Sequence, residues 1–291
     1  MASRPNSKRA MASTEAAIAI ETLGALSSAT QAMLDALVIG SSWNQTAKDW
    51  AFFARTGTVF GVRDAQGRVV ASGAVLPLGE KVAWISMILV APEARGQGLG
   101  SAVFAHCLRA VQAAGRTAYL DATPAGQRIY SQFGFSALWS LTRWQCDGQS
   151  AVEATVTPSE PFDIDSLAAL DTQAMGAPRR ALLADFLARE SSVCVHSPQG
   201  FALVRRGRVA HQIGPLLARD TSSARALLTL ALQALPGKFF IDVPDERDQL
   251  CHQLRDAGFT AQRGLVRMMA GTHPLRGQTH LIHAIAGPEF G

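Results

Sequence analysis

A glycine-rich stretch between an apolar run and an amphipathic segment constrains this chain more than any other feature. The run Val82–Val90 has the length and β-branched content of a buried strand. The residues that follow Leu99 are apolar at helical spacing, so the glycines between positions 96 and 100 lie on a strand-to-helix turn. Free N–H groups and the positive end of the helix dipole converge on such a turn, and Arg95 adds a cation. The stretch therefore predicts a phosphate-binding site.

Two other kinds of glycine-rich loop are excluded by the sequence. A dinucleotide-binding loop needs a third glycine where this chain has Ser101, and a Walker loop needs Gly-Lys-Ser or Gly-Lys-Thr, which the chain lacks. The remaining pattern is Arg95-x-x-Gly98-x-Gly100, after a strand that ends in Val90-x-Pro92. This pattern resembles the pyrophosphate-binding motif of the GNAT superfamily of acyl-CoA-dependent N-acetyltransferases. A tight turn that binds nothing is the alternative interpretation.

The order of the predicted elements supports the same resemblance. Residues 16–145 read as β-α-α-β-β-β-α-β-α-β, which is the order of a GNAT domain. The resemblance implies an α/β fold of the α+β type, in which helices flank a central mixed, mostly antiparallel twisted sheet. It also implies a β-bulge that splays the strand 82–90 from its neighbour and makes room for the pantetheine arm of coenzyme A.

The resemblance implies acetyl-CoA as the co-substrate and assigns residues to it. In GNAT enzymes a main-chain N–H of the strand before the loop polarises the thioester carbonyl, which maps here to Ile88, Leu89 and Val90. We place a further cofactor contact at Thr123, where the family often has an asparagine. The loop that would hold the pyrophosphate consists of Arg95, Gly96, Gln97, Gly98, Leu99, Gly100 and Ser101.

Tyr130 is the predicted catalytic acid. The family often has a tyrosine shortly before a Gly-Phe pair, and here Tyr130 precedes Gly134-Phe135. A tyrosine hydroxyl near the sulfur can protonate the departing thiolate, since its unperturbed pKa is about 10. The alternative interpretation is a half-buried aromatic residue on an amphipathic helix. The other tyrosine, Tyr119, lies inside a predicted strand.

The sequence does not identify the group that takes the proton of the amine. The strand 82–90, where the family often places its base, contains no carboxylate, and its hydroxyl residue Ser86 is too weak a base alone. Asp121 ends the next predicted strand and has three interpretations: a base that acts through water, a group that binds a cationic amine, or the cap of a helix that begins near Pro124. Glu80 is interpreted as a turn residue.

The length of the chain and an internal repeat predict two domains. A chain of 291 residues exceeds the usual size of one domain. The pair Gly134-Phe135 recurs as Gly258-Phe259, and at the same offset the apolar helix after the glycine loop recurs, with Arg219 in the place of Arg95. We predict a disordered tail over 1–14, a catalytic GNAT domain over 15–146, a linker over 147–161 and a second GNAT-like domain over 162–291.

The second half departs from the motif where the chemistry needs it. Ser222 stands in the place of Gly98, and Leu254 in the place of Tyr130. A serine at a helix N-terminus is a good cap and a poor phosphate cradle, and Asp220 would repel a pyrophosphate. We therefore predict that this half has lost cofactor binding, and that it supports the first domain or closes over the acceptor site.

Composition argues against several other classes of protein. The net charge is +4, but the basic residues are scattered without interleaved aromatics, so we expect no nucleic-acid partner. No apolar run reaches the roughly 18 residues that span a bilayer, so we expect no membrane partner. Four cysteines without a C-x-x-C pair, and no secretory segment, predict a reduced cytoplasmic protein. We expect no metal at His273, His280 or His283, which lie in a stretch containing glycine and proline.

These observations predict an acyl-CoA-dependent N-acyltransferase. We expect it to transfer acetyl from acetyl-CoA to a primary amine by direct attack within a ternary complex. The acceptor is a small-molecule or peptide amine whose identity the sequence does not specify, and the oligomeric state is equally unspecified. The alternative hypothesis is a non-catalytic tandem protein that binds acyl-CoA and has a regulatory role. The missing carboxylate on strand 82–90 leaves this alternative open.

Overall fold

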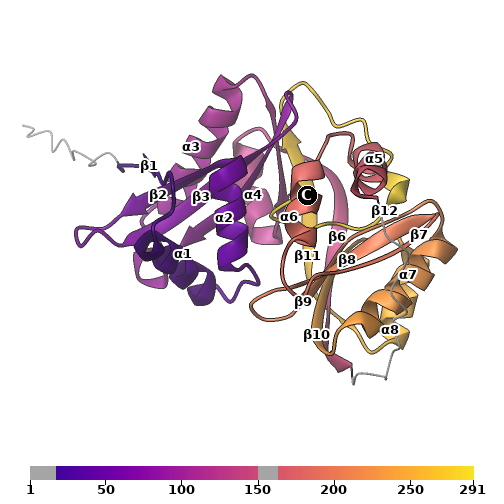
Figure 1. The fold of residues 1–291 in the computed structure, drawn as a ribbon. Helices are drawn as coiled ribbons and strands as arrows, with labels where there is room; N and C mark the ends of the chain where they lie inside the picture. The colour runs from indigo at the N-terminus through magenta and orange to yellow at the C-terminus, as the bar shows by residue number, and fades with distance from the viewer. Residues whose placement is uncertain (1–17, 150–162) are drawn as a thin grey trace, which may run out of the picture.

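The computed structural model describes residues 18–149 and 163–291, which form one 12-stranded sheet with helices against it (Figure 1). The tail predicted for residues 1–14 lies outside the described residues, as does most of the linker predicted for 147–161. Within the described ranges the chain forms eight α-helices and two short 3-10 helices.

The first half has the order of elements that the sequence predicts. The predicted strand 82–90 is present with the same bounds, and its neighbours differ from the predicted ranges by a few residues at their ends. The elements are β1 (Glu21–Thr22), α1 (Ser28–Gly40), α2 (Ala47–Thr56), β2 (Thr58–Arg63), β3 (Val69–Leu78), β4 (Val82–Val90), η1 (Pro92–Ala94), α3 (Leu99–Ala113), β5 (Thr117–Ala122), α4 (Pro124–Gln132) and β6 (Ser136–Gln149).

The second half repeats this order without a counterpart of β1. Its elements are α5 (Ile164–Met175), α6 (Arg180–Leu187), β7 (Val193–Ser197), β8 (Gly200–Arg206), β9 (His211–Ala218), α7 (Thr221–Ala234), β10 (Gly237–Pro244), α8 (Asp248–Asp256), β11 (Thr260–Ala270), η2 (Thr279–Leu281) and β12 (Ile282–Ala284). The sheet is mixed and mostly antiparallel, as predicted, since among the described strands only the β4–β5 and β9–β10 pairs are parallel.

The predicted internal repeat is visible in the ends of α4 and α8. Gly134 and Gly258 follow these helices with φ angles of +83° and +82°, a left-handed conformation that suits glycine. The next residue donates its N–H to an equivalent carbonyl in each half, Phe135 to Tyr130 and Phe259 to Leu254. Leu254 is therefore the structural counterpart of Tyr130.

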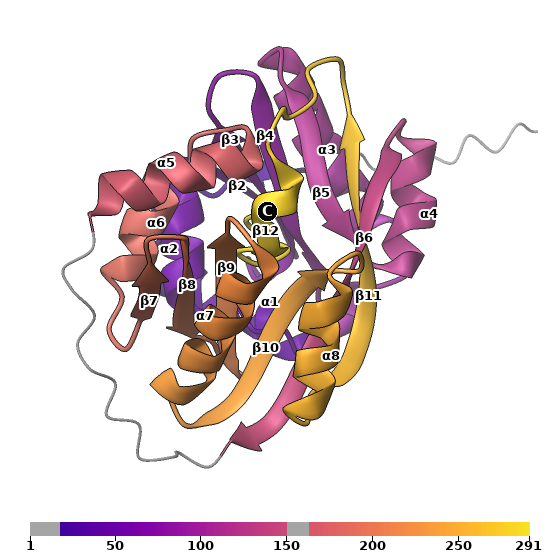
Figure 2. The ribbon, with the colours of Figure 1, turned by 90° about the vertical axis from the view of Figure 1, so that its right-hand side faces the viewer.

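The last long strand of each half pairs with the other half. The order across the sheet is β1-β2-β3-β4-β5-β11-β6-β10-β9-β8-β7, so β11 lies between β5 and β6, and β6 lies between β11 and β10. All pairings at this junction are antiparallel. Figures 1 and 2 show β6 and β11 crossing the molecule where the two halves meet. Neither half completes its own sheet.

The sequence predicts a central sheet in each half, and this exchange joins the two into one sheet. β6 continues to Gln149, inside the predicted linker, because its outer part pairs with β10 as far as Gly237. The apolar core is also shared. The ring of Phe290 stacks on that of Phe53, with 5.1 Å between the ring centroids. The ring of Phe186 packs edge-on against Phe290, with 5.2 Å between the centroids.

Two buried ion pairs link the exchanged strands to their neighbours. Arg267 of β11 donates to both carboxylate oxygens of Asp121 of β5, at 2.9 Å each. Arg143 of β6 donates to both oxygens of Asp242 of β10, at 2.8 and 2.7 Å. All four side chains are at most 4% exposed. In each pair the Asp and the Arg lie opposite one another in register, so the two pairs are counterparts in the repeat.

Aromatic rings enclose these guanidinium groups. Arg267 lies between the rings of Trp84 and Trp139, at 4.6 and 4.4 Å from their centroids. Arg143 lies over the ring of Phe240 at 5.2 Å. Water is excluded on these faces, so each charge depends on its partner carboxylate.

We expect Arg267→Met to destabilise the fold strongly. The substitution leaves the buried Asp121 carboxylate without its cation, which costs about 3–5 kcal/mol in comparable buried pairs. Urea denaturation measures the free energy of unfolding. Arg68→Met is the matched control, because it removes a cation from an exposed pair with Asp64 and leaves stability nearly unchanged. Equal unfolding midpoints for the two variants would contradict this role for Arg267.

Candidate active site

The site begins where β4 and β5 separate. The two strands pair in parallel only from Val82 to Trp84 and from Thr117 to Tyr119. Beyond this point residues 85–90 and 120–122 diverge, and a pocket opens between them. An opening between parallel strands exposes backbone polar groups that a ligand can bind.

A β-bulge in β4 lies at the opening, as predicted. Ser72 of β3 pairs with Leu89 of β4, and Ala74 pairs with Ser86. One residue of β3 therefore lies opposite two residues of β4, and these two form the bulge. Met87 lies in the bulge with a φ of +57°, which is uncommon for a residue other than glycine. The Ser72 hydroxyl donates to the Met87 carbonyl at 3.0 Å and holds this conformation. The bulge turns β4 away from regular pairing where the ligand would lie.

The glycine loop forms an open N-terminus for α3. Gly98 is the N-cap residue with a φ of +76°, and a Cβ atom added there would meet no other atom within 4 Å. The first helical hydrogen bond runs from Ala102 N–H to the Gly98 carbonyl at 3.0 Å, so the three residues before Ala102 keep free N–H groups. The Arg95 Nε donates to the Val90 carbonyl at 3.3 Å, which places the guanidinium beside the loop.

Most of the predicted cofactor-binding residues line one pocket over this loop. Leu89 and Gln97 do not line it, and Thr123 lines the adjoining pocket between β4 and β5. Tyr130 and Ile88 line both pockets, so the two pockets adjoin at these side chains. The loop pocket is lined by Ile88, Val90, Ala94, Arg95, Gly96, Gly98, Leu99, Gly100, Ser101, Phe104, Ile129 and Tyr130.

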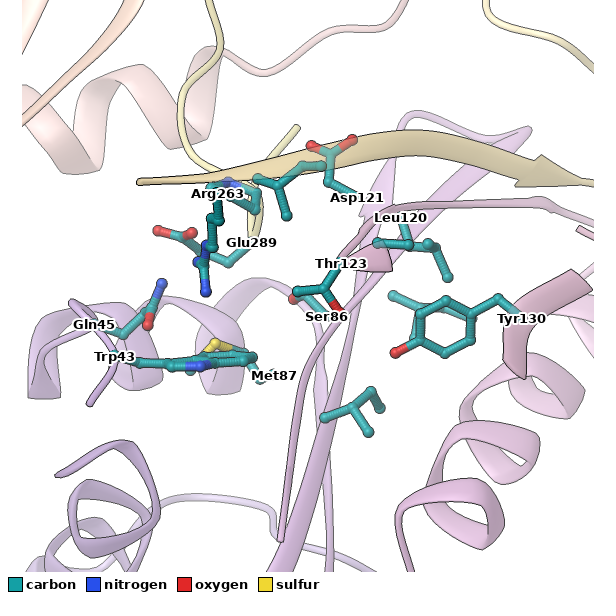
Figure 3. Close-up of a pocket in the computed structure, with 15 residues that line it drawn as sticks. Trp43, Gln45, Ser86, Met87, Leu120, Asp121, Thr123, Tyr130, Arg263 and Glu289 are labelled. Atoms are coloured by element: carbon teal, nitrogen blue, oxygen red, sulfur yellow. The ribbon is translucent and has the colours of Figure 1, made fainter. Parts of the chain in front are cut away.

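Tyr130 lies at the junction of the two pockets. Its ring packs on Phe104, with 4.3 Å between the centroids, and its hydroxyl points into the pocket (Figure 3). Burial raises the pKa of Tyr130 to about 12, because the phenolate would lose its hydration. The hydroxyl therefore carries its proton at neutral pH and can donate it.

The structure corrects the interpretation of Asp121. Thr123, not Asp121, caps α4, since its hydroxyl accepts the N–H of Gly126 at 3.2 Å. Both oxygens of Asp121 accept from Arg267, and the carboxylate points away from Tyr130 in Figure 3. Burial is the largest cause of a raised pKa at Asp121, and Arg267 opposes it. Asp121 lines the pocket between β4 and β5, but Arg267 engages both of its oxygens, which favours a role in the strand exchange over a base or an amine-binding group.

Residues of the second half line the pocket, and sequence reasoning missed them. Arg263 of β11 and Glu289 of the C-terminal segment lie on one side of it, opposite Tyr130 (Figure 3). The strand exchange brings Arg263 there, and no local motif indicates it. Glu289 follows Gly287-Pro288, far from the glycine loop in sequence, and its neighbours in the sequence do not indicate a place in this pocket either. Trp43 and Gln45, between α1 and α2, complete this side.

Several polar atoms in the pocket have no protein partner. Within residues 18–149 and 163–291, Ser86 Oγ, Gln45 Oε1 and Arg263 Nε are buried without a hydrogen bond. Buried polar groups are almost always paired in folded proteins, so three in one pocket indicate a ligand site.

The corresponding place in the second half is filled. The N-cap of α7 is Asp220, whose carboxylate accepts from Ser223 N–H at 2.8 Å and from the Ser222 hydroxyl at 2.7 Å. This corrects the prediction that Ser222 is the cap. β9 and β10 also separate after a short parallel pairing, and β12 fills their opening by pairing with β9. The helix end and the opening are both occupied by the chain itself.

The described residues offer neither a metal site nor a membrane-spanning helix. No group of three or more His, Cys, Asp or Glu side chains that could hold a metal ion occurs in the described part of the chain. His283 is buried in β12, where burial lowers its pKa to about 4. Among the described helices, none is long and apolar enough to cross a membrane.

Comparisons with known proteins match both halves to one family. Residues 31–135 match a profile described as the Acetyltransferase (GNAT) family, and residues 167–284 match a profile described as an Acetyltransferase (GNAT) domain. Together the two matched ranges cover most of the chain.

Individual relatives and structures agree with these matches. The chain is 29% identical to a holothin acyltransferase of a Pseudoalteromonas strain over 76% of this chain and 78% of the relative. It is 24% identical to an uncharacterized N-acetyltransferase of Bacillus subtilis, over 70% and 74%. The fold is similar to that of a candidate acetyltransferase from Pyrococcus horikoshii, with a TM-score of 0.79, 18% identity and coverage of 94% and 95%. A tandem GNAT protein from the clavulanic acid biosynthesis pathway has a TM-score of 0.59, 16% identity and coverage of 88% and 99%.

We expect Tyr130 to remain un-ionised where free tyrosine ionises. Because burial raises its pKa to about 12, the ultraviolet difference spectrum between wild type and Tyr130→Phe carries no tyrosinate signal at a pH of about 10. Free tyrosine in the same buffers is the reference. A difference spectrum that titrates together with the reference would contradict the buried position of the hydroxyl.

Proposed function

This chain belongs to the GNAT family of acetyltransferases, and we propose that it transfers an acetyl group from acetyl-CoA to a primary amine by direct attack within a ternary complex. One observation carries the proposal. Tyr130 lies where the pocket over the glycine loop joins the opening between β4 and β5. A donor bound along the loop would bring its thioester to this junction.

The glycine loop supplies the binding site for the pyrophosphate. Free N–H groups before Ala102, the positive end of the α3 dipole and the Arg95 guanidinium all favour an anion there. The side chains of Ile88, Val90 and Phe104 give the pocket an apolar wall, which suits the pantetheine arm. Binding energy from this remote part of the donor holds the thioester in place for reaction.

The bulge and Tyr130 supply the two chemical contributions on the donor side. Main-chain N–H groups around the bulge at Met87 are available to polarise the thioester carbonyl and to stabilise the oxyanion that forms on attack. When the C–S bond breaks, Tyr130 gives its proton to the thiolate, and the nitrogen of the new amide returns a proton to the tyrosinate. Tyr130 ends the cycle neutral, as its raised pKa favours.

One working site per chain is part of the proposal. Asp220 places its own carboxylate at the end of α7, where a second working site would have to bind the pyrophosphate. β12 occupies the opening between β9 and β10. Leu254 offers no proton in the place of Tyr130. The relatives named as acyltransferases support acyl transfer as the reaction.

Gly98→Glu is expected to abolish binding of acetyl-CoA. The new side chain strains a position with a φ of +76° and brings a carboxylate into the anion site, so affinity falls at least roughly 100-fold. Isothermal titration with acetyl-CoA measures affinity and stoichiometry, with one site per wild-type chain. Ser222→Glu places the same charge at the equivalent end of α7 and leaves binding unchanged. Unchanged affinity in Gly98→Glu, or two sites in wild type, would refute the assignment.

Tyr130→Phe is expected to lower kcat while the Kd for acetyl-CoA stays the same. The phenylalanine keeps the packing on Phe104 but removes the proton donor, and loss of a general acid costs roughly 100-fold or more. Thiol release with a panel of small primary amines measures the rate. Tyr119→Phe is the matched control, because that hydroxyl accepts the N–H of Leu275 away from the site. A kcat equal to that of wild type would remove Tyr130 from the chemistry.

A further inference from the structure

The C-terminal segment Ile282–Gly291 connects the two openings of the sheet. Its first part, β12, pairs with β9 and fills the opening of the second half. Ile285 donates its N–H to the Asp242 carbonyl at 3.0 Å, which ties the segment to β10 on the other side. Gly214 makes this approach possible, since an added Cβ atom would lie 2.0 Å from the Ile285 carbonyl oxygen. The segment is therefore held in place before it reaches the pocket of the first half.

The end of the segment is anchored on both sides of Glu289. The Pro288 carbonyl accepts the indole N–H of Trp84 at 2.9 Å. Phe290 is fully buried and stacks on Phe53 of α2 at 5.1 Å. Glu289 between them lines the pocket next to β4 and β5. These anchors fix the carboxylate on the wall that faces Tyr130 (Figure 3).

The surroundings of Glu289 make it a stronger base than an ordinary carboxylate. It forms an ion pair with Arg205 of β8, with 3.3 Å from Nη2 to Oε1. Asp49 and Arg143 act on it from further away with opposite signs. Burial is the largest effect and raises the pKa of Glu289, while Arg205 opposes the rise. A buried carboxylate with one long ion pair keeps capacity to accept further hydrogen bonds.

Arg263 lies on the same wall, where Asp242 and Glu289 attract its charge and Arg143 repels it. Among the described residues it forms no ion pair, and its buried Nε has no hydrogen bond. The nearby unpaired oxygen atoms of Gln45 and Ser86, and the ring of Trp43, complete the surface. A molecule bound here meets an anionic group and a cationic group side by side, over an aromatic ring (Figure 3).

We propose that the segment Ile282–Gly291 completes an acceptor subsite, in which Glu289 binds and deprotonates the ammonium of a small primary amine and Arg263 binds a carbonyl or carboxylate group of the same molecule. This inference rests on the proposed acyl transfer and names its acceptor class. It also identifies the base that β4 lacks.

The protons and electrons balance in this scheme. The ammonium gives one proton to Glu289, and the free amine attacks the thioester carbon to form the C–N bond. The intermediate expels the thiolate as the C–S bond breaks, and Tyr130 protonates the sulfur. The second proton of the nitrogen passes to Tyr130, and Glu289 releases its proton to solvent.

Two matched amines and three variants test the proposal. Phenylalaninamide carries a carbonyl beside its amine, and phenethylamine is the same molecule without the carboxamide. Thiol release by wild type is expected to show a kcat/KM at least about tenfold higher for phenylalaninamide. Arg263→Gln removes this preference. Glu289→Gln lowers kcat/KM for both amines by roughly 100-fold and leaves the calorimetric Kd for acetyl-CoA within about twofold. Glu80→Gln, at an exposed turn, changes neither quantity.

If Arg263→Gln keeps the preference, the difference comes from the amines themselves, and the role of Arg263 in the subsite is overturned. If wild type binds acetyl-CoA but shows no preference, or acetylates neither amine, the acceptor class is overturned while the proposed acyl transfer stands. If wild type does not bind acetyl-CoA, the proposed function itself fails. Turnover by Glu289→Gln close to that of wild type overturns Glu289 as the base. Should Glu289→Gln fail to fold in a thermal melt, the ratio of the two amines in Arg263→Gln still decides the subsite.

Discussion

The exchange of β6 and β11 is the constraint on which the rest of the structure depends. Each strand leaves its own half and is held in the other by a buried Asp–Arg pair, Asp121 with Arg267 and Asp242 with Arg143. A register slip by one residue would turn each arginine to the opposite face of the sheet and leave its aspartate unpaired. The ion pairs therefore specify the register, and the register places Arg263 at the pocket.

The two halves use one architecture for different purposes. In both, two parallel strands separate after a short pairing and a helix begins beside the opening. In the first half no described residue fills the opening or the helix end, and Tyr130 lines the pockets at both. In the second half Asp220 and β12 satisfy the same backbone positions from within the chain. The filled opening guides the C-terminal segment toward the free one.

The sequence predicts local features well and the relation between the halves poorly. The strand 82–90, the loop at Gly98 and the helix of Tyr130 follow from periodicity and capping, which act over a few residues. Asp121 looks like a cap or a base locally, but its partner Arg267 lies far along the chain, and strand register at that distance leaves no sequence signal. For the same reason Glu289 could not be assigned: its place depends on how β12 pairs with β9.

The position of β11 also determines when the sheet can be completed during synthesis. β5 and β6 are made before β11, the strand that lies between them in the sheet, and Glu289 is made after β11. Until then two long strand edges stay open, which invites pairing with other chains. A chain truncated before Thr260 lacks both the central strand and the pocket wall formed by Arg263 and Glu289.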